Sequence, residues 1–178
     1  MSVLSVSMSP SHSFGKMPTS YIYLLPKRGV QGDAHSASCG TSPSSNPRQV
    51  HIIDSSLFTS LAKSSSKYPS FQLSPGSLGE NITTTSLDLF SLSEGTRLHF
   101  GDHEDHPVVK VTGLREPKKR LDEWPEGLLE RCAVKDKKGR KAGTKIGVYA
   151  TVVKEGYVQA GCVVEVESPK TFRELGYV

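Results

Sequence analysis

An aspartate and a histidine stand two residues apart after a pair of glycines, in the segment Gly29-Val30-Gln31-Gly32-Asp33-Ala34-His35. Asp33 could orient the His35 imidazole for proton transfer, or both side chains could bind a ligand. A turn in which Asp33 bonds to its own backbone explains the pattern about as well. The motif therefore predicts either a site or an ordinary turn.

A glycine turn precedes a second polar pair, in the segment Pro75-Gly76-Ser77-Leu78-Gly79-Glu80-Asn81-Ile82-Thr83. The backbone N–H groups of such a turn can cradle an anion. The alternative is a β-turn that Glu80 and Asn81 merely brace. In isolation the two interpretations have similar weight.

A cluster of cations follows a predicted strand, in the segment Arg115-Glu116-Pro117-Lys118-Lys119-Arg120. Cations at a strand end can recognise phosphate, and Arg is suited to bidentate contacts. The formal net charge of the chain is +4, and residues 115–145 hold eleven Lys or Arg against six Asp or Glu. The alternative is a solvated surface segment. Nucleic acid is not indicated, because Trp124 is the only aromatic residue in this stretch and a stacking platform needs several.

Two other groups of reactive residues carry less weight. His99, His103 and His106 lie among acidic residues and could suggest a metal, but the Gly101-Asp102 turn of a hairpin accounts for them, so no metal ligand is predicted. Three cysteines lack the spacing of a metal knuckle or a disulfide framework. No signal-peptide core and no membrane-length apolar stretch is present in the sequence. We therefore expect a reducing, cytoplasmic setting.

Short strands must position these motifs. At 178 residues the chain fits a single domain spanning 1–178, and an exposed Ser/Gly/Pro-rich loop is expected over 36–47. Apolar alternation and β-branched residues predict strands, and a helix is expected after Asp54 and a short one near 127–133. The predicted strands are 3–8, 21–25, 48–53, 80–85, 87–92, 97–100, 108–113, 146–153 and 162–166. Segments 87–92 and 97–100 are expected to approach a hairpin. This series, without βαβ alternation, predicts a mainly β protein that forms a closed or nearly closed β-barrel with a few short helices.

The order of these motifs resembles the free-standing MOSC (molybdenum-cofactor sulfurase C-terminal) domains over about residues 3–167. The region Gly79-Glu80-Asn81 is the most distinctive part of the match. The other matching segments are Gly32-Asp33-x-His35, Arg48-Gln49-Val50, Leu87-Asp88-Leu89, Gly95-Thr96-x-Leu98 and Gly127-Leu128-Leu129.

The resemblance implies a MOSC-like barrel with a pocket for an anionic pterin such as the molybdenum cofactor, and chemistry linked to sulfur transfer. In the family, sulfur is thought to come from a cysteine desulfurase that itself carries pyridoxal phosphate, and to ride as a persulfide on one cysteine. A desulfurase or a molybdoenzyme is therefore the partner that the resemblance implies. The implied catalytic residues are Asp33, His35, Glu80 and Lys118, and the implied cofactor-binding residues are Arg48, Asn81, Thr83 and Arg115.

The chain departs from the family at the residue after Pro117. The family cysteine follows proline in an Arg-x-Pro-Cys motif, whereas Lys118 stands here. An ammonium carries no persulfide, although it can pair with phosphate or, if desolvated, form a Schiff base. Cys132 or Cys39 could replace the thiol, but Cys132 is expected to be packed, and Cys162 to lie in the core. Three functions stay open: a transferase or cofactor-dependent enzyme, a binding module without catalysis, and a barrel used for other small-molecule chemistry.

Overall fold

The computed structural model of the chain describes residues 1–36, 46–62, 67, 70, 72–116, 127–135 and 141–178. The predicted loop at 36–47 falls outside these residues except at its ends. Cys39, Lys118 and Trp124 also lie outside the described residues.

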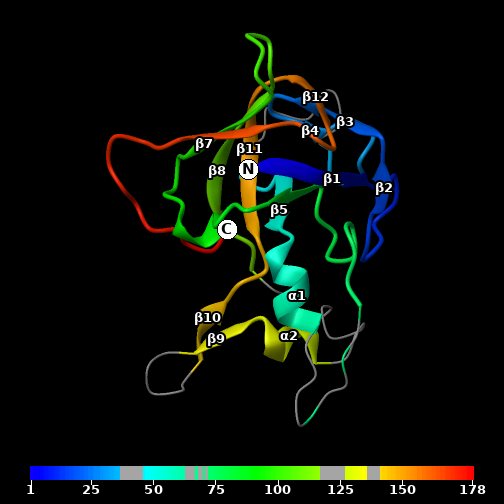
Figure 1. Cartoon of the computed structure of the whole chain (residues 1–178), viewed down its shortest axis with the longest axis vertical. Coiled ribbons are helices and arrows are strands. Elements are labelled where there is room, and N and C mark those ends of the chain that lie inside the picture. Colours follow the sequence, from blue (N-terminus) through cyan, green and yellow to red (C-terminus); the bar gives the residue numbers. More distant parts are fainter. Residues whose placement is uncertain (37–45, 63–66, 68–69, 71, 117–126, 136–140) are drawn as a thin grey trace.

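Three sheets make up most of the structure, which confirms the mainly β prediction (Figure 1). The largest has eight strands in the order β13-β7-β8-β11-β5-β6-β1-β2. Its neighbouring strands are antiparallel except for β5 and β6, which are parallel. The bounds are β1 Ser2–Met8, β2 Met17–Thr19, β5 Val50–Asp54, β6 Ile82–Thr85, β7 Arg97–Phe100, β8 Val108–Leu114, β11 Val148–Lys154 and β13 Val164–Glu167.

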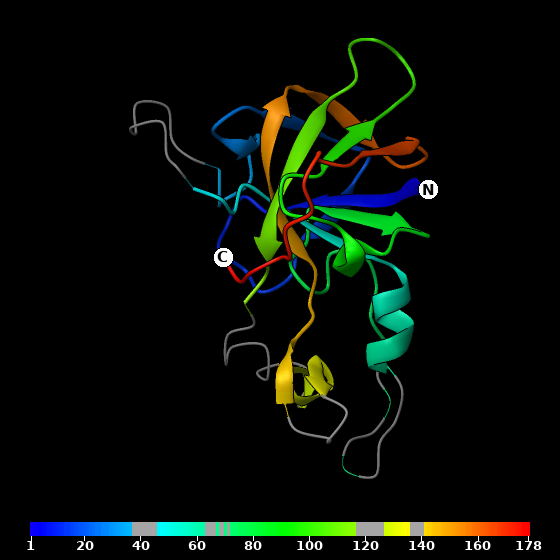
Figure 2. The same ribbon diagram turned by 90° about the vertical axis from the view of Figure 1, so that its left-hand side faces the viewer.

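The smaller elements lie beside this sheet. A second sheet has the order β12-β3-β4, and β9 pairs with β10 in a third. Figures 1 and 2 both place the two helices and the β9–β10 ribbon at one end of the molecule and the large sheet at the other. The bounds are β3 Tyr21–Leu25, β4 Gly29–Val30, β9 Ala133–Lys135, β10 Lys141–Thr144, β12 Gly156–Gln159, α1 Ser56–Ala62, α2 Leu128–Arg131 and the 3-10 helix η1 Leu89–Ser91.

The predicted barrel closure is not found: among the described residues no sheet closes on itself. A single bridge joins Ser2 to Val163, and a few backbone bonds connect residues 1–3 to residues 161–164, among them the Val3 N–H to the Cys162 carbonyl at 2.8 Å and the Gly161 N–H to the Val3 carbonyl at 2.9 Å. These contacts do not pair β1 with β13 as strands of the sheet. Closure requires a matching tilt and stagger of all strands. The alternation of apolar residues along each strand contains no information about either quantity, so it predicts strands but not closure.

The hairpin predicted between segments 87–92 and 97–100 is not found. Residues 89–91 form η1, capped by the Asp88 carboxylate, which accepts from the Phe90 N–H. Strand β7 instead pairs with β8, so the hairpin turn is 101–107. Segment 87–92 has the apolar content of a strand, but its N-cap aspartate favours a helical turn.

The core follows the alternation read from the sequence. On β11, Val148, Ala150 and Val152 are buried while the residues between them are partly exposed. A smaller cluster packs α1 and α2 together and includes Phe58, Leu61, Leu128 and Cys132. Cys132 is thus packed as expected, whereas Cys162 is only partly buried against the larger cluster. None of the described helices has the length and apolar character needed to span a membrane.

Candidate anion-binding site

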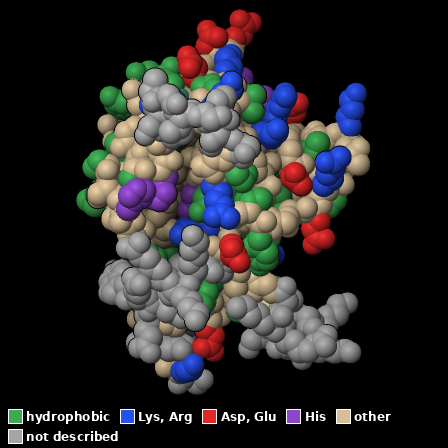
Figure 3. All heavy atoms as spheres, turned by 180° about the vertical axis from the view of Figure 1, so that it is seen from behind, with side chains coloured by type: hydrophobic (Ala, Val, Ile, Leu, Met, Phe, Trp, Pro, Cys, Tyr) green, Lys and Arg blue, Asp and Glu red, His purple; other side chains and the backbone are tan. Residues whose placement is uncertain are grey.

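A cavity of about 360 Å³ lies where three segments meet. They are the N-terminal loop at residues 9–16, the turn at residues 32–35, and residues 115–116, which follow β8 directly. Its cationic and imidazole lining residues are Lys16, His35, Arg48, His51 and Arg115, and its amides are Asn46, Gln49 and Asn81. Figure 3 shows histidine and basic side chains side by side on this face. A larger cavity of about 830 Å³ is lined by α1, residues 85–90 and 131–134, and Lys145. It contains none of the predicted site residues.

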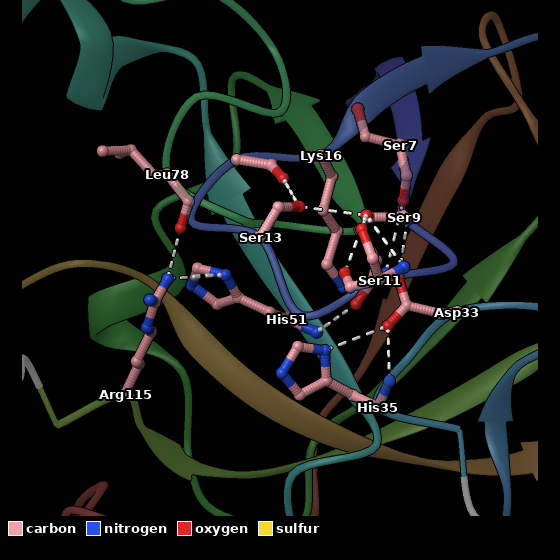
Figure 4. A network of polar contacts seen from close by, with 12 residues as sticks. Ser7, Ser9, Ser11, Ser13, Lys16, Asp33, His35, His51, Leu78 and Arg115 are labelled. Carbon is pink, nitrogen blue, oxygen red and sulfur yellow. Dashed lines mark hydrogen bonds and ion pairs between the residues drawn. The ribbon is translucent and has the colours of Figure 1, made fainter. Parts of the chain in front are cut away.

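Asp33 is the hub of the first polar network (Figure 4). Its buried carboxylate lies 2.7 Å from the Lys16 ammonium and accepts from the Ser9 N–H and from the His35 N–H. The His35 Nδ1 lies 3.2 Å from Oδ1. Burial opposes the charged carboxylate, but the bonds from His35 and the charge of Lys16 outweigh it and hold the pKa of Asp33 far below its usual range. Asp33 therefore orients an exposed His35 at the cavity mouth.

Lys16 was not expected as a site residue. Its side chain is only 6% exposed, and its N–H donates to the Gly76 carbonyl, which ties the N-terminal loop to the glycine turn. Burial lowers the pKa of Lys16, and the neighbouring Asp33 opposes that shift. Lys16 stands alone in a polar segment with no motif around it, so only its pairing with Asp33 identifies it.

Glu80 lies behind the cavity and does not line it. Its side chain is fully buried and accepts from the Gly76 N–H at 2.5 Å, the Leu78 N–H at 3.1 Å and the Thr83 hydroxyl at 3.1 Å. Burial raises the pKa of Glu80, and these bonds oppose the shift. Gly76 has φ of 89°, and a Cβ there would lie 2.1 Å from the Lys16 carbonyl oxygen. This geometry matches the turn-bracing alternative for Glu80. Thr83 is fully buried beside Glu80 and is not among the residues that line the cavity.

Glu80→Gln should therefore destabilise the fold. An amide has one acceptor oxygen in place of two, so a buried donor of the 76–78 turn loses its partner, which costs about 1–3 kcal/mol. The measurement is the free energy of unfolding in urea. Glu94→Gln is the matched control, since Glu94 is exposed. A Glu80 variant as stable as the Glu94 variant would contradict the bracing role.

Asn81 links the Asp33 network to strand β5. Its Nδ2 donates to the Ser7 carbonyl and to Asp33 Oδ2, both over 3.2 Å, and its Oδ1 accepts from the His51 N–H. The amide therefore lies at the cavity wall with its polar atoms already bonded. Because these atoms are bonded to the protein, Asn81 positions the Asp33 carboxylate rather than a ligand.

His51 and Arg115 form the other side of the cavity (Figure 4). The His51 Nε2 lies 2.9 Å from the Ile146 carbonyl and must donate to it, so the Nδ1 accepts from Arg115 Nη1 at 3.1 Å. The same Arg115 nitrogen donates to the Leu78 carbonyl at 2.5 Å. Burial, together with the charge of Arg115, holds the pKa of His51 well below its usual range. His51 is thus a neutral support for the guanidinium. Its one sequence signal is a histidine inside an apolar strand.

The neutral state of His51 predicts a pH dependence of stability. Below about pH 6.5 the unfolded chain protonates this imidazole while the folded chain does not, so stability falls as pH decreases from there. His51→Gln should remove a slope of up to about 1.4 kcal/mol per pH unit from the free energy of unfolding between pH 8 and 5. His103→Gln, at an exposed turn position, serves as control. An unchanged slope in the His51 variant would show that this imidazole is charged when folded.

The predicted residues are thus only partly brought together. His35, Asn81 and Arg115 line the cavity, and exposed Arg48 lies at its rim. Asp33 does not line it and lies behind His35 and Asn81, which it contacts. Burial lowers the pKa of Arg115, yet its guanidinium stays charged near neutrality. Among the described residues, no carboxylate forms an ion pair with Arg115, so its charge is available to an anion.

Comparison with known proteins supports the fold and the family. The model of the MOSC domain matches residues 39–165. YuaD from Bacillus subtilis superposes with a TM-score of 0.70 at 19% identity, covering 95% of this chain and 96% of that one. YiiM from Escherichia coli gives 0.65 at 17%, covering 98% and 73%, and YiiM from Geobacillus stearothermophilus gives 0.62 at 17%, covering 94% and 75%. At these identities the structural likeness concerns the fold. No curated protein matches the sequence.

Proposed function

The chain belongs to the MOSC domain family, and we propose on this basis that its cavity binds an anionic pterin of the molybdenum-cofactor type. The family is associated with binding related to this cofactor. For this chain, the proposal is supported mainly by the position of the Arg115 guanidinium and by its lack of a carboxylate partner among the described residues. Its guanidinium lines the cavity, and Leu78 and His51 hold it from behind.

The charges of the cavity favour an anionic ligand, because its lining contains three cations, Lys16, Arg48 and Arg115, against one carboxylate, Glu116. The Lys16 ammonium is neutralised by Asp33 at 2.7 Å, whereas Arg115 lacks a carboxylate partner within the described part of the chain. Exposed Arg48 adds a second cation at the rim. A phosphate or carboxylate oxygen is the group that a fixed guanidinium binds best, because its N–H fork matches the two acceptor oxygens.

The donor set fits the anionic part of the cofactor better than its metal. No cysteine occurs among the described residues that line the cavity, and Cys132 contributes to the other cavity. A bound molybdenum centre would supply redox or sulfur-transfer chemistry. The chain's own contribution would be to hold the anion with Arg115 and Arg48 and to exchange a proton at the exposed His35 ring, which Asp33 orients.

A binding module without catalysis is the second candidate, and Lys118 in place of the family cysteine favours it. The two candidates predict different results for Lys118→Cys. With a pyridoxal-phosphate-dependent cysteine desulfurase and free cysteine supplied, protein-bound persulfide that forms only in this variant would identify the natural protein as a binder. Persulfide on the unmodified protein would identify a transfer enzyme that uses another cysteine.

The direct test is the content of the protein purified from its own cells. We expect a pterin, measured by fluorescence after oxidation, together with molybdenum measured by mass spectrometry. A fluorescence titration of the ligand-free protein with pterin-6-carboxylate supplies the affinity. Absence of pterin and molybdenum, combined with no binding of this probe, would refute the proposal.

A further inference from the structure

Two histidines of the β7–β8 hairpin approach each other through their ring nitrogens. His99 Nδ1 lies 2.8 Å from His106 Nε2. His99 stands on β7, and His106 is the next-to-last residue of the 101–107 turn that projects at the top of Figure 1. Neither residue lines either of the two cavities described above. The pair is therefore a feature separate from the proposed pterin site.

The outer nitrogen of each ring is already committed as a donor. His106 Nδ1 contacts the His103 carbonyl, which can only accept. His99 Nε2 lies 3.0 Å from the Glu167 carboxylate on β13. A ring with a single proton then has it on the outer nitrogen, and two such rings would face each other with their lone pairs across 2.8 Å. Either a shared proton or a metal ion between the two nitrogens makes this arrangement favourable.

We propose that His99 and His106 chelate a divalent transition-metal ion of the copper, nickel and zinc class. Imidazole nitrogen suits these ions. Histidine ligands of metals characteristically donate their other N–H to a carboxylate or a backbone carbonyl, and here Glu167 and the His103 carbonyl fill those two roles. Both rings therefore have the outer hydrogen bond that is characteristic of metal-bound histidines.

The spacing agrees with two ligands at a right angle on one ion. Two nitrogens each about 2.0 Å from an ion lie about 2.8 Å apart at that angle, as in the tetragonal sites of Cu(II) and Ni(II). The rings need only turn until both lone pairs converge. His106 lies on an exposed turn, which permits that rotation. No group of three or more metal-binding side chains occurs in the described part of the chain, so water would complete the coordination.

The local charges favour a cation. Asp102, Glu104 and Asp105 are exposed on the same turn, and Glu167 lies beside His99. The neighbouring cations are Arg97, 3.7 Å from Glu167, and Lys154, which bonds to the Glu104 carbonyl at 2.5 Å and lies 3.5 Å from Asp105. Four carboxylates against two cations leave a negative surface around the two rings.

The test is calorimetric titration of the tag-free, full-length protein with Ni²⁺ alone, together with anomalous diffraction at the nickel edge. We expect one saturable site between the two rings. Binding should be lost in His99→Gln and in His106→Gln, should weaken about 10-fold in Glu167→Gln, and should persist in His103→Gln, since only the backbone carbonyl of residue 103 takes part. Circular dichroism verifies that each variant is folded.

Two results would overturn the inference. One is the absence of saturable Ni²⁺ binding to the natural protein, in which case the two rings share a proton. The other is undiminished binding in folded His99→Gln or His106→Gln protein. Either result leaves the pterin proposal unaffected, because the pterin test uses a different probe and different residues.

Discussion

Arg115→Met is expected to weaken the binding of pterin-6-carboxylate about 30-fold. Methionine keeps much of the side-chain volume but removes the guanidinium charge. That charge lines the cavity and has no carboxylate partner among the described residues. Loss of one partner of a desolvated, hydrogen-bonded charge pair costs about 2–5 kcal/mol. Because Arg115 is only partly buried, we take the lower limit, and about 2 kcal/mol corresponds to about 30-fold in affinity. The dissociation constant from fluorescence titration provides the measurement.

Lys110→Met is the matched control for charge. Lys110 lies on the same strand that leads into Arg115, and its side chain is exposed. The substitution removes one positive charge without altering the cavity, so affinity should stay within about twofold. If both variants lose affinity equally, the effect of Arg115 is only that of net charge, and the proposed contact is wrong.

Asp33→Ala is expected to destabilise the protein by about 3–5 kcal/mol. The substitution leaves the Lys16 ammonium buried without its 2.7 Å partner, which is the situation in which breaking a buried ion pair is most costly. It also removes the acceptor for the Ser9 N–H and for Asn81 Nδ2. Urea unfolding at pH 7 measures the difference in free energy.

The double variant Lys16→Met/Asp33→Ala separates the charge effect from the packing effect. Removing the ammonium as well should recover a large part of the loss, since no uncompensated charge then stays buried. A double variant less stable than Asp33→Ala would show that Lys16 does not depend on this carboxylate.

The depressed pKa of Asp33 also sets the pH range in which it contributes. Its carboxylate is charged in the folded chain at pH values where the unfolded chain protonates it. The contribution is therefore complete above the unfolded pKa of about 4 and is lost as pH falls below that value. Asp33→Ala should show a shallower loss of stability than the natural protein in that acidic range.

Local patterns predicted the regular elements well because such patterns reflect burial on one face. Strand β3 has the predicted bounds, and the alternation on β11 correctly separates its buried and partly exposed residues. Strand β12 was missed, since the glycines at 156 and 161 indicate only a link between strands. Pairing was the harder problem: the partner of β7 and the open edges of the large sheet depend on contacts that no single segment encodes.

The polar residues of the site also fall into two groups, those that local sequence patterns predict and those that only tertiary contacts reveal. Motifs alone predicted Asp33, His35 and Arg115 as site residues, because glycine turns and strand ends expose polar side chains. They did not identify Lys16 or His51, which have no motif around them. For Glu80 the local alternative, a brace for the glycine turn, is the arrangement that the structure contains.

By itself, the sequence determined the family, the mainly β composition and the polar residues that stand at turns, because these depend on residue types and on short periodic patterns. Only the tertiary structure decided which charges neutralise each other and which stay available. Asp33 and Lys16 are seventeen residues apart, and His51 and Arg115 are sixty-four apart. Their contacts depend on how the loops pack across the large sheet, and that packing pairs Lys16 with Asp33 but leaves Arg115 without a carboxylate partner among the described residues.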